Sequence, residues 1–472
     1  MTRLTWIEAT VDDPGVPTRD ADLLAIVRRE TVTGKDPEMT RYCVIGAGAA
    51  GISTLQRLRA EGMDVDCFEK TDRVGGHWHT DYDALHLITS RDMTGFEGFP
   101  MPADYPHFPR RDQVREYLES YARAHGLYDV IRFETEVISV VPRPGAGAVG
   151  SHGWTVLLGT GESIDYDGVF VANGHLWDQK RPAISEDFTG KQIHSGSYRN
   201  TGDIDGTRVL VVGAGNSGCD LAADAAQHRL DVDIVVREGM YFQPKTYFGV
   251  PRQEIPWMSQ FAPDEQDLIA RLLARVSIGE WKNYPGLPEP AYRSLAEGRT
   301  VVNELLLYWI QHGRIAVRPG ISRIEGQTVH FADGQSKEYD TILWATGFHA
   351  SLPFLDDALT PRQGGVPLRL AAGIVPVGLD KLYYIGLSAP RGPQLPVYGV
   401  QAALALRMVA LHEAAPEGHV PLARYLGELQ EADDRIDIVR AVWNDQLTDT
   451  ERLLDAYALA QAETGAAETA GV

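Results

Sequence analysis

Two glycine-rich loops of the form G-x-G-x-x-G constrain this chain more than any other feature. Each loop follows a short run of apolar, largely β-branched residues and opens a helical pattern, as the phosphate-binding turn of a dinucleotide-binding βαβ unit does. In such a turn the glycines let the backbone approach a pyrophosphate closely, and the helix N-terminus attracts its negative charge. The glycines are Gly46, Gly48 and Gly51 in the first loop and Gly213, Gly215 and Gly218 in the second. Two such loops predict two dinucleotides bound to one α/β chain.

The acid that follows the first loop indicates the first dinucleotide. A strand of buried type is expected over residues 42–45 and a helix over residues 53–60, and the next strand ends at Phe68, directly before Glu69. A carboxylate about 20 residues after the loop accepts hydrogen bonds from ribose hydroxyls. This unit is therefore expected to bind FAD.

The second unit repeats the plan with a residue of opposite charge. Strands are expected over residues 209–212 and 232–236, a helix is expected from Asn216 to about Gln227, and Arg237 follows the second strand. An arginine binds a 2′-phosphate that an acid would repel, so this unit is expected to bind NADP rather than NAD. A glycine turn can also merely join a strand to a helix, but two loops with oppositely charged partners favour two cofactor sites.

The composition narrows the class of protein. A chain of 472 residues exceeds one ordinary core, so two or more domains are expected, and the net charge of -21 argues against nucleic acid and anionic membranes as partners. The three cysteines, Cys43, Cys67 and Cys219, form no Cys-x-x-Cys motif, which argues against a disulfide reductase. They are expected to be small buried residues in a reducing cytosol. No apolar stretch is expected to reach membrane-spanning length, and residues 1–40 lack the hydrophobic segment of a signal peptide, so a cytoplasmic protein is expected.

Local patterns between and after the loops predict further elements. The proline- and aromatic-rich segment 96–109 is expected to be an ordered extended loop. Apolar patterns over residues 268–276 and 305–309 predict two helices that face the core rather than a membrane. Asp333 and Gly334 mark a hairpin turn, after which residues 339–345 are expected to return to the first domain as a strand. The helix expected after the extended loop buries Val114, Tyr117, Leu118 and Tyr121 on one face.

The order of these features places one dinucleotide domain inside the other. The acidic leader, with one helix expected over residues 21–30, lies outside both units and is expected to pack on the surface or against a partner subunit, which allows a homodimer. The expected units are an N-terminal extension (1–40), the first part of the FAD domain (41–186), the NADP domain (187–329), the second part of the FAD domain with C-terminal helices (330–460) and a frayed tail (461–472).

Three short motifs give the chain a resemblance to a known family. Residues 188–198 read F-T-G-K-Q-I-H-S-G-S-Y and lie between the two loops, where they match the F-x-G-x-x-x-H-x-x-x-Y/F signature of the flavin-containing monooxygenases, class B flavoprotein monooxygenases. The G-G-H-W of residues 75–78 and the A-T-G-F of residues 345–348 extend the similarity over roughly residues 41–410. The leader resembles the N-terminal extension of a bacterial subgroup, some members of which perform Baeyer-Villiger oxidation.

This resemblance implies a fold, an activity and cofactors. The fold is α/β, with two Rossmann-like dinucleotide-binding domains of which the NADP domain is inserted in the FAD domain. NADPH reduces FAD, the reduced flavin takes up O2 as a C4a-hydroperoxide, and one oxygen atom passes to the nitrogen or sulfur of a small organic substrate. Besides the loop glycines, Glu69 and Arg237, the candidate cofactor-binding residues are Lys70, Gly76, His77, Trp78, Val137, Gln401, Asn216 and Ser217.

The candidate catalytic residues are Ser90, Thr89 and His194. Matching the family pattern puts Ile88 where many members have an asparagine beside the flavin, and because isoleucine cannot donate a hydrogen bond, Thr89 or Ser90 is expected to substitute. His194 is expected to be a hinge or inter-domain hydrogen-bonding residue rather than a general base. No metal is expected, because no carboxylate or cysteine lies near His77 in the sequence to complete a site.

Two other activities stay open at this point. Baeyer-Villiger oxidation of ketones to esters or lactones would use the same oxygenated cofactor, although Tyr198 stands where the usual Baeyer-Villiger signature has tryptophan. An NADPH oxidase or reductase would need no stable oxygenated flavin, and it would release hydrogen peroxide without substrate.

Overall fold

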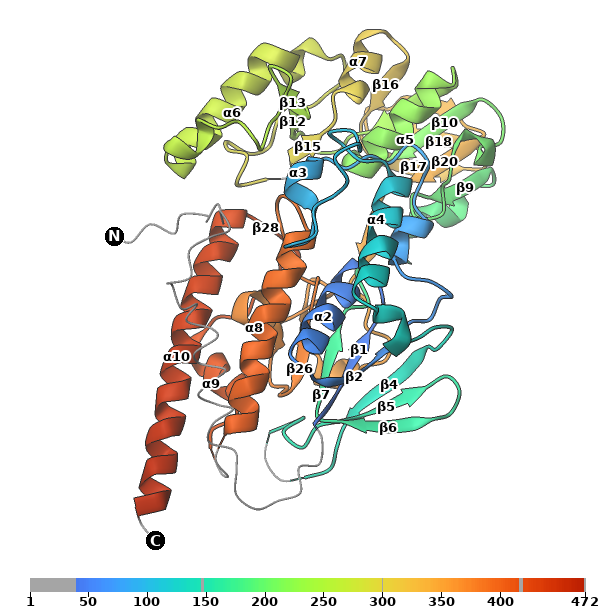
Figure 1. Cartoon of the computed structure of the whole chain (residues 1–472). Helices are drawn as coiled ribbons and strands as arrows, with labels where there is room; N and C mark the ends of the chain where they lie inside the picture. Colours follow the sequence, from blue (N-terminus) through green and yellow to red (C-terminus); the bar gives the residue numbers. More distant parts are fainter. Residues whose placement is uncertain (1–39, 146–147, 299, 416–418, 471–472) are drawn as a thin grey trace.

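The computed structural model describes residues 40–145, 148–298, 300–415 and 419–470 (Figure 1). The helix expected over residues 21–30 lies outside these ranges. In Figure 1 the second dinucleotide unit forms the upper part of the molecule, and the first unit forms the lower part with two long C-terminal helices at its side. The helices are α2 (Ala49–Ala60), α3 (Arg91–Thr94), α4 (Arg111–Ala124), α5 (Asn216–Gln227), α6 (Pro263–Ile278), α7 (Leu305–Gln311), α8 (Leu395–Ala414), α9 (Leu422–Leu429) and α10 (Arg440–Ala470).

The first unit is built on a parallel sheet of strand order β26-β7-β1-β2-β3. Its strands are fully or largely buried because layers cover both faces, as is usual for parallel sheets. Helix α2 packs between this sheet and α8, and a three-stranded antiparallel sheet covers the other face. The strands are β1 (Arg41–Ile45), β2 (Asp64–Phe68), β3 (Ile131–Arg132), β7 (Gly168–Val171) and β26 (Leu382–Tyr384), with β4 (Val137–Pro142), β5 (Trp154–Leu158) and β6 (Ser163–Tyr166) in the covering sheet.

The second unit repeats this design with a parallel sheet of order β16-β11-β10-β20-β9. Helix α5 covers one face, and the antiparallel sheet of β17, β18 and β19 covers the other. The strands are β9 (Lys191–His194), β10 (Arg208–Val212), β11 (Asp231–Val235), β16 (Ile315–Arg318), β17 (Ile321–Glu325), β18 (Thr328–Phe331), β19 (Ser336–Glu338) and β20 (Thr341–Trp344). The expected hairpin turn at Asp333 and Gly334 is confirmed, since β18 and β19 pair antiparallel.

The prediction that residues 339–345 return to the first domain is wrong. Strand β20 pairs with β10 on one side and β9 on the other, so it is an inner strand of the second sheet. The second unit therefore extends past residue 329 to at least Trp344. The chain re-enters the first sheet only at β26, which pairs with β7.

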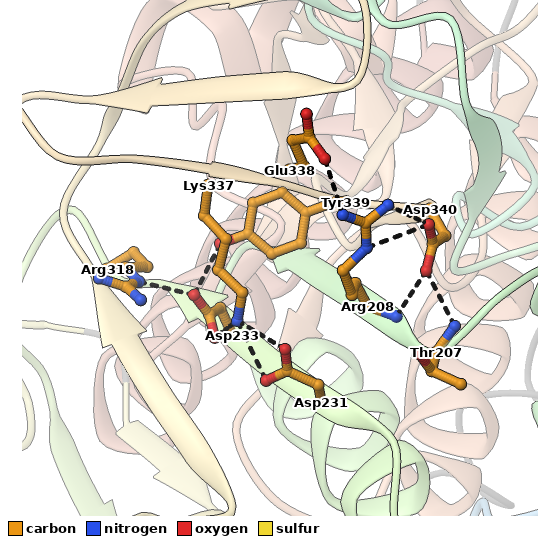
Figure 2. Close-up of polar contacts among 9 residues, drawn as sticks. All are labelled: Thr207, Arg208, Asp231, Asp233, Arg318, Lys337, Glu338, Tyr339 and Asp340. Atoms are coloured by element: carbon orange, nitrogen blue, oxygen red, sulfur yellow. Dashed lines mark hydrogen bonds and ion pairs between the residues drawn. The ribbon is translucent and has the colours of Figure 1, made fainter.

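A buried carboxylate joins the two layers of the second unit (Figure 2). Asp233 on β11 is 1% exposed, and its oxygens accept hydrogen bonds from Arg318 Nε at 2.6 Å, the Tyr339 hydroxyl at 2.6 Å and Lys337 Nζ at 3.0 Å. A buried charge is costly unless it is paired and hydrogen-bonded, and these three donors supply that compensation. The cluster therefore fixes the β17–β19 sheet against the parallel sheet.

The expected helices differ in how well they are buried. Helix α4 buries Val114, Tyr117, Leu118 and Tyr121 as predicted. The prediction that the 268–276 pattern faces the core holds only in part. Leu273 in α6 packs against a small core cluster, but the side chains of Leu268, Leu272 and Val276 are 49%, 51% and 84% exposed. In α7 the prediction holds for Leu306, which is fully buried, but Leu305 is exposed.

The C-terminal helices depart from two further expectations. Helix α8 has 20 residues and a mean hydropathy of 1.2 over its most apolar window, so by length and composition a stretch of membrane-spanning length does exist. It is 56% buried in that window and packs against α2, as the core helix of a globular protein does. The tail expected to be frayed from residue 461 continues α10 as a helix to Ala470.

Short strands complete the fold between the two units and around the C-terminal segment. They pair as β12 (Tyr241–Gln243) with β15 (Thr300–Val302), β13 (Thr246–Tyr247) with β14 (Val250–Pro251), β8 (Asp178–Gln179) with β21 (Phe348–His349), β22 (Arg362–Gln363) with β23 (Val366–Pro367), β24 (Arg369–Leu370) with β25 (Val375–Pro376), and β27 (Ala389–Pro390) with β28 (Asp437–Ile438).

Candidate active site

A cavity of about 2280 Å³ lies between the two units. Its wall includes the first glycine loop, the start of α5 after the second loop, the β13–β14 hairpin and the segment that leads from β27 into α8. Single small-molecule sites usually measure about 300–1,000 Å³. The cavity therefore has room for more than one ligand of dinucleotide size.

The first glycine loop is shaped for a phosphate group at the N-terminus of α2. Gly51 packs so closely on the strand that a Cβ there would lie 1.8 Å from the Gly46 carbonyl oxygen, which leaves no room for any other residue. Gly48 faces Gly76, where a Cβ would lie 3.4 Å from the Gly48 Cα. Two side-chain-free backbones thus form opposite walls of a narrow groove, and side chains would fill it. This cradle fits a pyrophosphate.

Glu69 lies at the carboxyl end of β2 and is 6% exposed. Its Oε2 accepts a hydrogen bond of 2.7 Å from the backbone N–H of Ala47, and its Oε1 accepts bonds of 2.8 Å from the Thr71 N–H and hydroxyl. Oε1 therefore has both lone pairs occupied, whereas Oε2 keeps one for a further donor. Because Glu69 also lines the cavity, that lone pair is placed for a ribose hydroxyl.

The second loop leaves a similar opening at the start of α5. Nothing lies within 4 Å of a Cβ built on Gly215, and Asn216 and Ser217 line the cavity. Asn216 is held in place because its Oδ1 accepts a hydrogen bond of 2.9 Å from the Val302 N–H. Arg237 follows β11 with an exposed side chain beside Gly320, and it lies off the cavity wall. Its guanidinium forms no hydrogen bond or ion pair within the part of the chain that the structure describes, so all five donors are free.

The remaining candidate cofactor residues divide into two groups. Lys70, His77, Trp78 and Val137 line the cavity, as does Gly76. Gln401 lies behind the wall, where its side chain accepts from the Gly386 N–H at 2.8 Å and donates to the Ser388 carbonyl at 2.9 Å. Gly386 itself lines the cavity, so Gln401 supports the wall rather than reaching through it.

The two histidines beside Trp78 have protein partners. His77 Nδ1 lies 2.6 Å from the Asp81 carboxylate, so the sequence argument that no acid lies near these histidines is wrong. His79 Nε2 contacts the Val74 carbonyl oxygen at 2.7 Å. Among the residues with described positions, no group of three His, Cys, Asp or Glu side chains is arranged to hold a metal ion.

The three candidate catalytic residues occupy different environments. Ile88 and Thr89 line the cavity, and the Thr89 hydroxyl lies 2.8 Å from that of Thr94. Because Thr94 donates to the Ser90 carbonyl at 2.6 Å, Thr89 must donate to Thr94, and its proton is committed. The Ser90 hydroxyl is buried, does not line the cavity and forms no hydrogen bond with the described residues.

His194 links two chain segments at the end of the second sheet. Its Nε2 donates to the Gly347 carbonyl at 3.0 Å, and its Nδ1 accepts from the Gly196 N–H at 3.1 Å. Burial lowers the pKa of the ring, in agreement with the neutral form that these bonds require. With both nitrogens occupied, His194 is arranged as a positioning residue rather than a base.

The comparison with known sequences identifies the family. A sequence model of the flavin-binding monooxygenase-like family matches residues 39–420. This chain belongs to that family. The chain is 32% identical over 389 residues to flavin-containing monooxygenase 5 of Oryctolagus cuniculus, which covers 77% of this chain and 72% of the relative. It is 30% identical over 390 residues to flavin-containing monooxygenase 2 of Homo sapiens, with the same coverage.

Solved structures of flavoprotein monooxygenases share the fold. Cyclohexanone monooxygenase in an open form superposes with a TM-score of 0.63 at 17% identity, covering 91% of this chain and 98% of the other. A flavin-containing monooxygenase from Stenotrophomonas maltophilia gives a TM-score of 0.59 at 21% identity, covering 79% and 98%. These structures show that the two units share the Rossmann-like fold of that class. The family match identifies the protein as an FAD-dependent monooxygenase that uses NADPH and O2.

One group on the wall of this monooxygenase was missed by the sequence reasoning. Asp220, on α5 shortly after the second loop, accepts hydrogen bonds from the Tyr82 hydroxyl at 2.8 Å and from Asn303 Nδ2 at 2.7 Å. Burial raises the pKa of Asp220 to about 6. An acid two residues beyond the loop was visible in the sequence, but its partners come from distant segments that only the fold brings together.

Proposed function

We propose that this monooxygenase transfers one oxygen atom to the nitrogen or sulfur of a small organic substrate. The observation that carries the proposal is Tyr198 at the end of the signature segment. Its ring is fully buried and its hydroxyl donates a hydrogen bond of 2.7 Å to Asp224 on α5. The tryptophan of the usual Baeyer-Villiger signature has no hydroxyl to donate to Asp224, so the packing of the NADP domain favours the tyrosine of the flavin-containing monooxygenase signature. Relatives at 30% identity bear the name dimethylaniline monooxygenase, N-oxide-forming, which supports the same chemistry.

Bound FAD, reduced by NADPH, supplies the reaction with O2, in which one oxygen atom enters the substrate and the other leaves as water. The chain's own residues orient the cofactors and exclude water. We assign the pyrophosphate of FAD to Gly46, Gly48, Gly51 and Gly76, and its ribose to Glu69. Lys70, His77, Trp78 and Val137 are assigned to the surrounding wall, and Gln401 to its support.

In the second unit we assign the pyrophosphate of NADP to Gly213, Gly215 and Gly218 with Asn216 and Ser217, and its 2′-phosphate to Arg237. His194 holds the chain between the domains at the Gly347 carbonyl. Ser90 is the better substitute for the missing asparagine, because its hydroxyl is uncommitted whereas the Thr89 hydroxyl already serves Thr94.

Two further expectations, on cellular location and oligomeric state, accompany this proposal. We infer a cytoplasmic location from the three cysteines, which are all buried and free of disulfides. A homodimer stays a prediction. The domain boundaries also stay predictions, except the expected end of the NADP domain at residue 329, which β20 extends to at least Trp344.

A product screen tests the proposed chemistry. Holoenzyme with NADPH and O2 is given methyl phenyl sulfide, N,N-dimethylaniline and cyclohexanone in separate reactions, and products are identified by mass spectrometry. The sulfoxide and the N-oxide are the expected products. Lactone from cyclohexanone without sulfoxide would replace the proposal with Baeyer-Villiger oxidation. Hydrogen peroxide formed in proportion to NADPH, with no oxygenated product, would indicate an oxidase.

A further inference from the structure

Arg252 is a desolvated cation on the cavity wall. It directly follows the β13–β14 hairpin, and its backbone N–H donates to the Lys245 carbonyl at 3.0 Å. In the guanidinium, NH1 donates to Gln243 Oε1 at 3.2 Å, while Nε is buried and forms no hydrogen bond to any residue that the structure describes. No described carboxylate lies within ion-pair distance of it. Burial lowers the pKa of Arg252, as expected for a cation removed from water without a counter-ion.

Three of the other four arginines on this wall have more side-chain partners than Arg252. The fourth, Arg199, donates from its side chain only to the Asp81 carbonyl at 2.9 Å. Arg391 Nε forms an ion pair of 3.0 Å with Asp437, and Arg362 Nε forms one of 3.2 Å with Asp357. Arg440 donates to the backbone carbonyls of residues 390, 391 and 393. Arg252 has only the single bond to the neutral Gln243. Arg252 is half-buried as a residue, with its Nε fully buried, and a charge with so little compensation costs free energy in the absence of a ligand. An incoming anion would recover part of that cost.

The side-chain partner of Arg252 connects it to the second unit. Gln243 on β12 pairs with Val302, whose N–H donates to Asn216 at the start of α5. The neighbours of Arg252 on the wall, Gln253 and Met258, come from the same segment after β13. A Cβ built on Gly392 would lie 3.6 Å from Gln253 Nε2 and 3.2 Å from Arg440, so this hairpin meets the segment between β27 and α8. Residues 246–260, the segment that contains Arg252, include none of the residues assigned to the two cofactors.

We propose that Arg252 binds a carboxylate of the substrate, so that the enzyme prefers organic acids that carry an oxidisable sulfur or nitrogen. The proposal rests on the oxygenation of sulfur or nitrogen proposed above. A guanidinium matches a carboxylate in a bidentate fork, which also fixes the orientation of the bound molecule. In a chain with net charge -21, an anionic substrate depends on such a local cation, because the overall field repels it.

The test compares two sulfides of nearly equal shape, 4-(methylthio)benzoate and 4-(methylthio)benzamide. In the wild type, kcat/KM for the acid is expected to exceed that for the amide about tenfold or more. Arg252→Gln should lower kcat/KM for the acid by about 10-fold to 100-fold, the range of a charge-assisted hydrogen bond, mainly through KM. The amide and the KM for NADPH should stay unchanged, and Arg252→Lys should retain part of the preference. Arg391→Gln is the matched control, since its charge is already paired with Asp437.

A binding measurement separates this proposal from the proposed function. Calorimetric titration of 4-methylbenzoate into holoenzyme with NADP+ should show binding in the wild type and about 10-fold or greater weakening in Arg252→Gln. If the wild type makes no sulfoxide yet binds the carboxylate through Arg252, the proposed oxygenation fails and the anion site stands. If sulfoxide forms from acid and amide with equal efficiency and the carboxylate does not bind, the anion site fails.

A third result would assign Arg252 to the coenzyme instead. In that case Arg252→Gln raises the KM for NADPH and lowers turnover of acid and amide alike, which overturns the proposal. Flavin content and thermal unfolding of each variant are measured first. If Arg252→Gln fails to fold, Arg252→Lys is the deciding variant, because the lysine ammonium keeps the charge but cannot form the two parallel hydrogen bonds of a guanidinium. An unchanged preference for the acid and an unchanged carboxylate affinity in Arg252→Lys would contradict bidentate binding.

Discussion

The Tyr82 hydroxyl donates a hydrogen bond of 2.8 Å to Asp220 Oδ2, and this pair joins the segment after the first glycine loop to the helix after the second. Asn303, which precedes α7, donates to the other oxygen of the same carboxylate at 2.7 Å. One side chain on the cavity wall thus gathers three segments that are distant in sequence.

Removing the Tyr82 hydroxyl should loosen the junction. Tyr82→Phe is expected to cost about 1 kcal/mol of unfolding free energy, because a buried hydrogen bond is lost, and to raise the KM for NADPH several-fold without loss of FAD. Denaturant unfolding, steady-state kinetics and flavin absorbance measure these effects. Tyr128→Phe is the control, since its hydroxyl forms no hydrogen bond with the described residues. Equal effects of both substitutions would show that the junction does not matter.

The pKa of Asp220 predicts a pH dependence of stability. Burial raises it to about 6, against about 3.9 for an unfolded aspartate. The folded state therefore binds more protons between these values, so the stabilising contribution is complete below pH ~4 and is lost as the pH rises through ~6. Asp220→Asn should flatten the fall in melting temperature between pH 4 and pH 6.5, measured by calorimetry. A steeper fall in the variant would contradict the assignment.

Glu69 should control the retention of FAD. In Glu69→Gln the amide nitrogen cannot accept from Ala47 or Thr71, so one buried donor loses its partner and the ribose loses a charged acceptor. FAD affinity should fall by about 10-fold to 100-fold, read as the Kd for reconstitution of the apoprotein. Glu162→Gln, an exposed substitution, should leave that Kd unchanged. Unchanged affinity in Glu69→Gln would remove Glu69 from the FAD site.

Arg237 should set the choice of coenzyme. Its free guanidinium beyond β11 predicts that Arg237→Ala weakens NADPH binding by about 1.5–3 kcal/mol and leaves NADH nearly unchanged. The ratio of kcat/KM for the two coenzymes reports the effect directly. Arg314→Ala, at an exposed position near β16, is the control. A parallel loss with both coenzymes would mean that Arg237 has only a structural role.

The hydroxyls of Thr89 and Ser90 should differ in their effect on the coupling of NADPH oxidation to product formation. Ser90→Ala removes an uncommitted buried hydroxyl and is expected to raise hydrogen peroxide release per NADPH consumed. Thr89→Val removes a bond to Thr94 and is expected to lower stability by about 1 kcal/mol with little change in that ratio. Peroxide is quantified with a peroxidase assay against product formed. The reverse order of effects would assign the role to Thr89.

Local sequence determined the parts of this protein that depend on neighbouring residues. The helix expected from Asn216 to Gln227 begins and ends at those residues, because the glycine loop fixes its start and the apolar spacing fixes its buried face. The strands before the two loops end at the predicted residues and begin one residue earlier, and the buried face of α4 is the predicted one. The family signature, with the charges at Glu69 and Arg237, was enough to predict the two cofactors.

Tertiary structure alone decided the features that depend on which segments meet. A buried strand reads the same in either sheet, so nothing in residues 339–345 distinguished pairing with β10 and β9 from a return to β7. The apolar stripe of α6 predicted burial, but only Leu273, Ala274 and Ile278 pack in a small core cluster, while Leu268, Leu272 and Val276 stay exposed. The partners of Asp220 and the lack of an acid beside Arg252 follow from long-range packing. The local sequence determines which helices and strands form and which motifs are present. The burial and the hydrogen-bond partners of a charged side chain depend on distant segments that meet only in the folded chain.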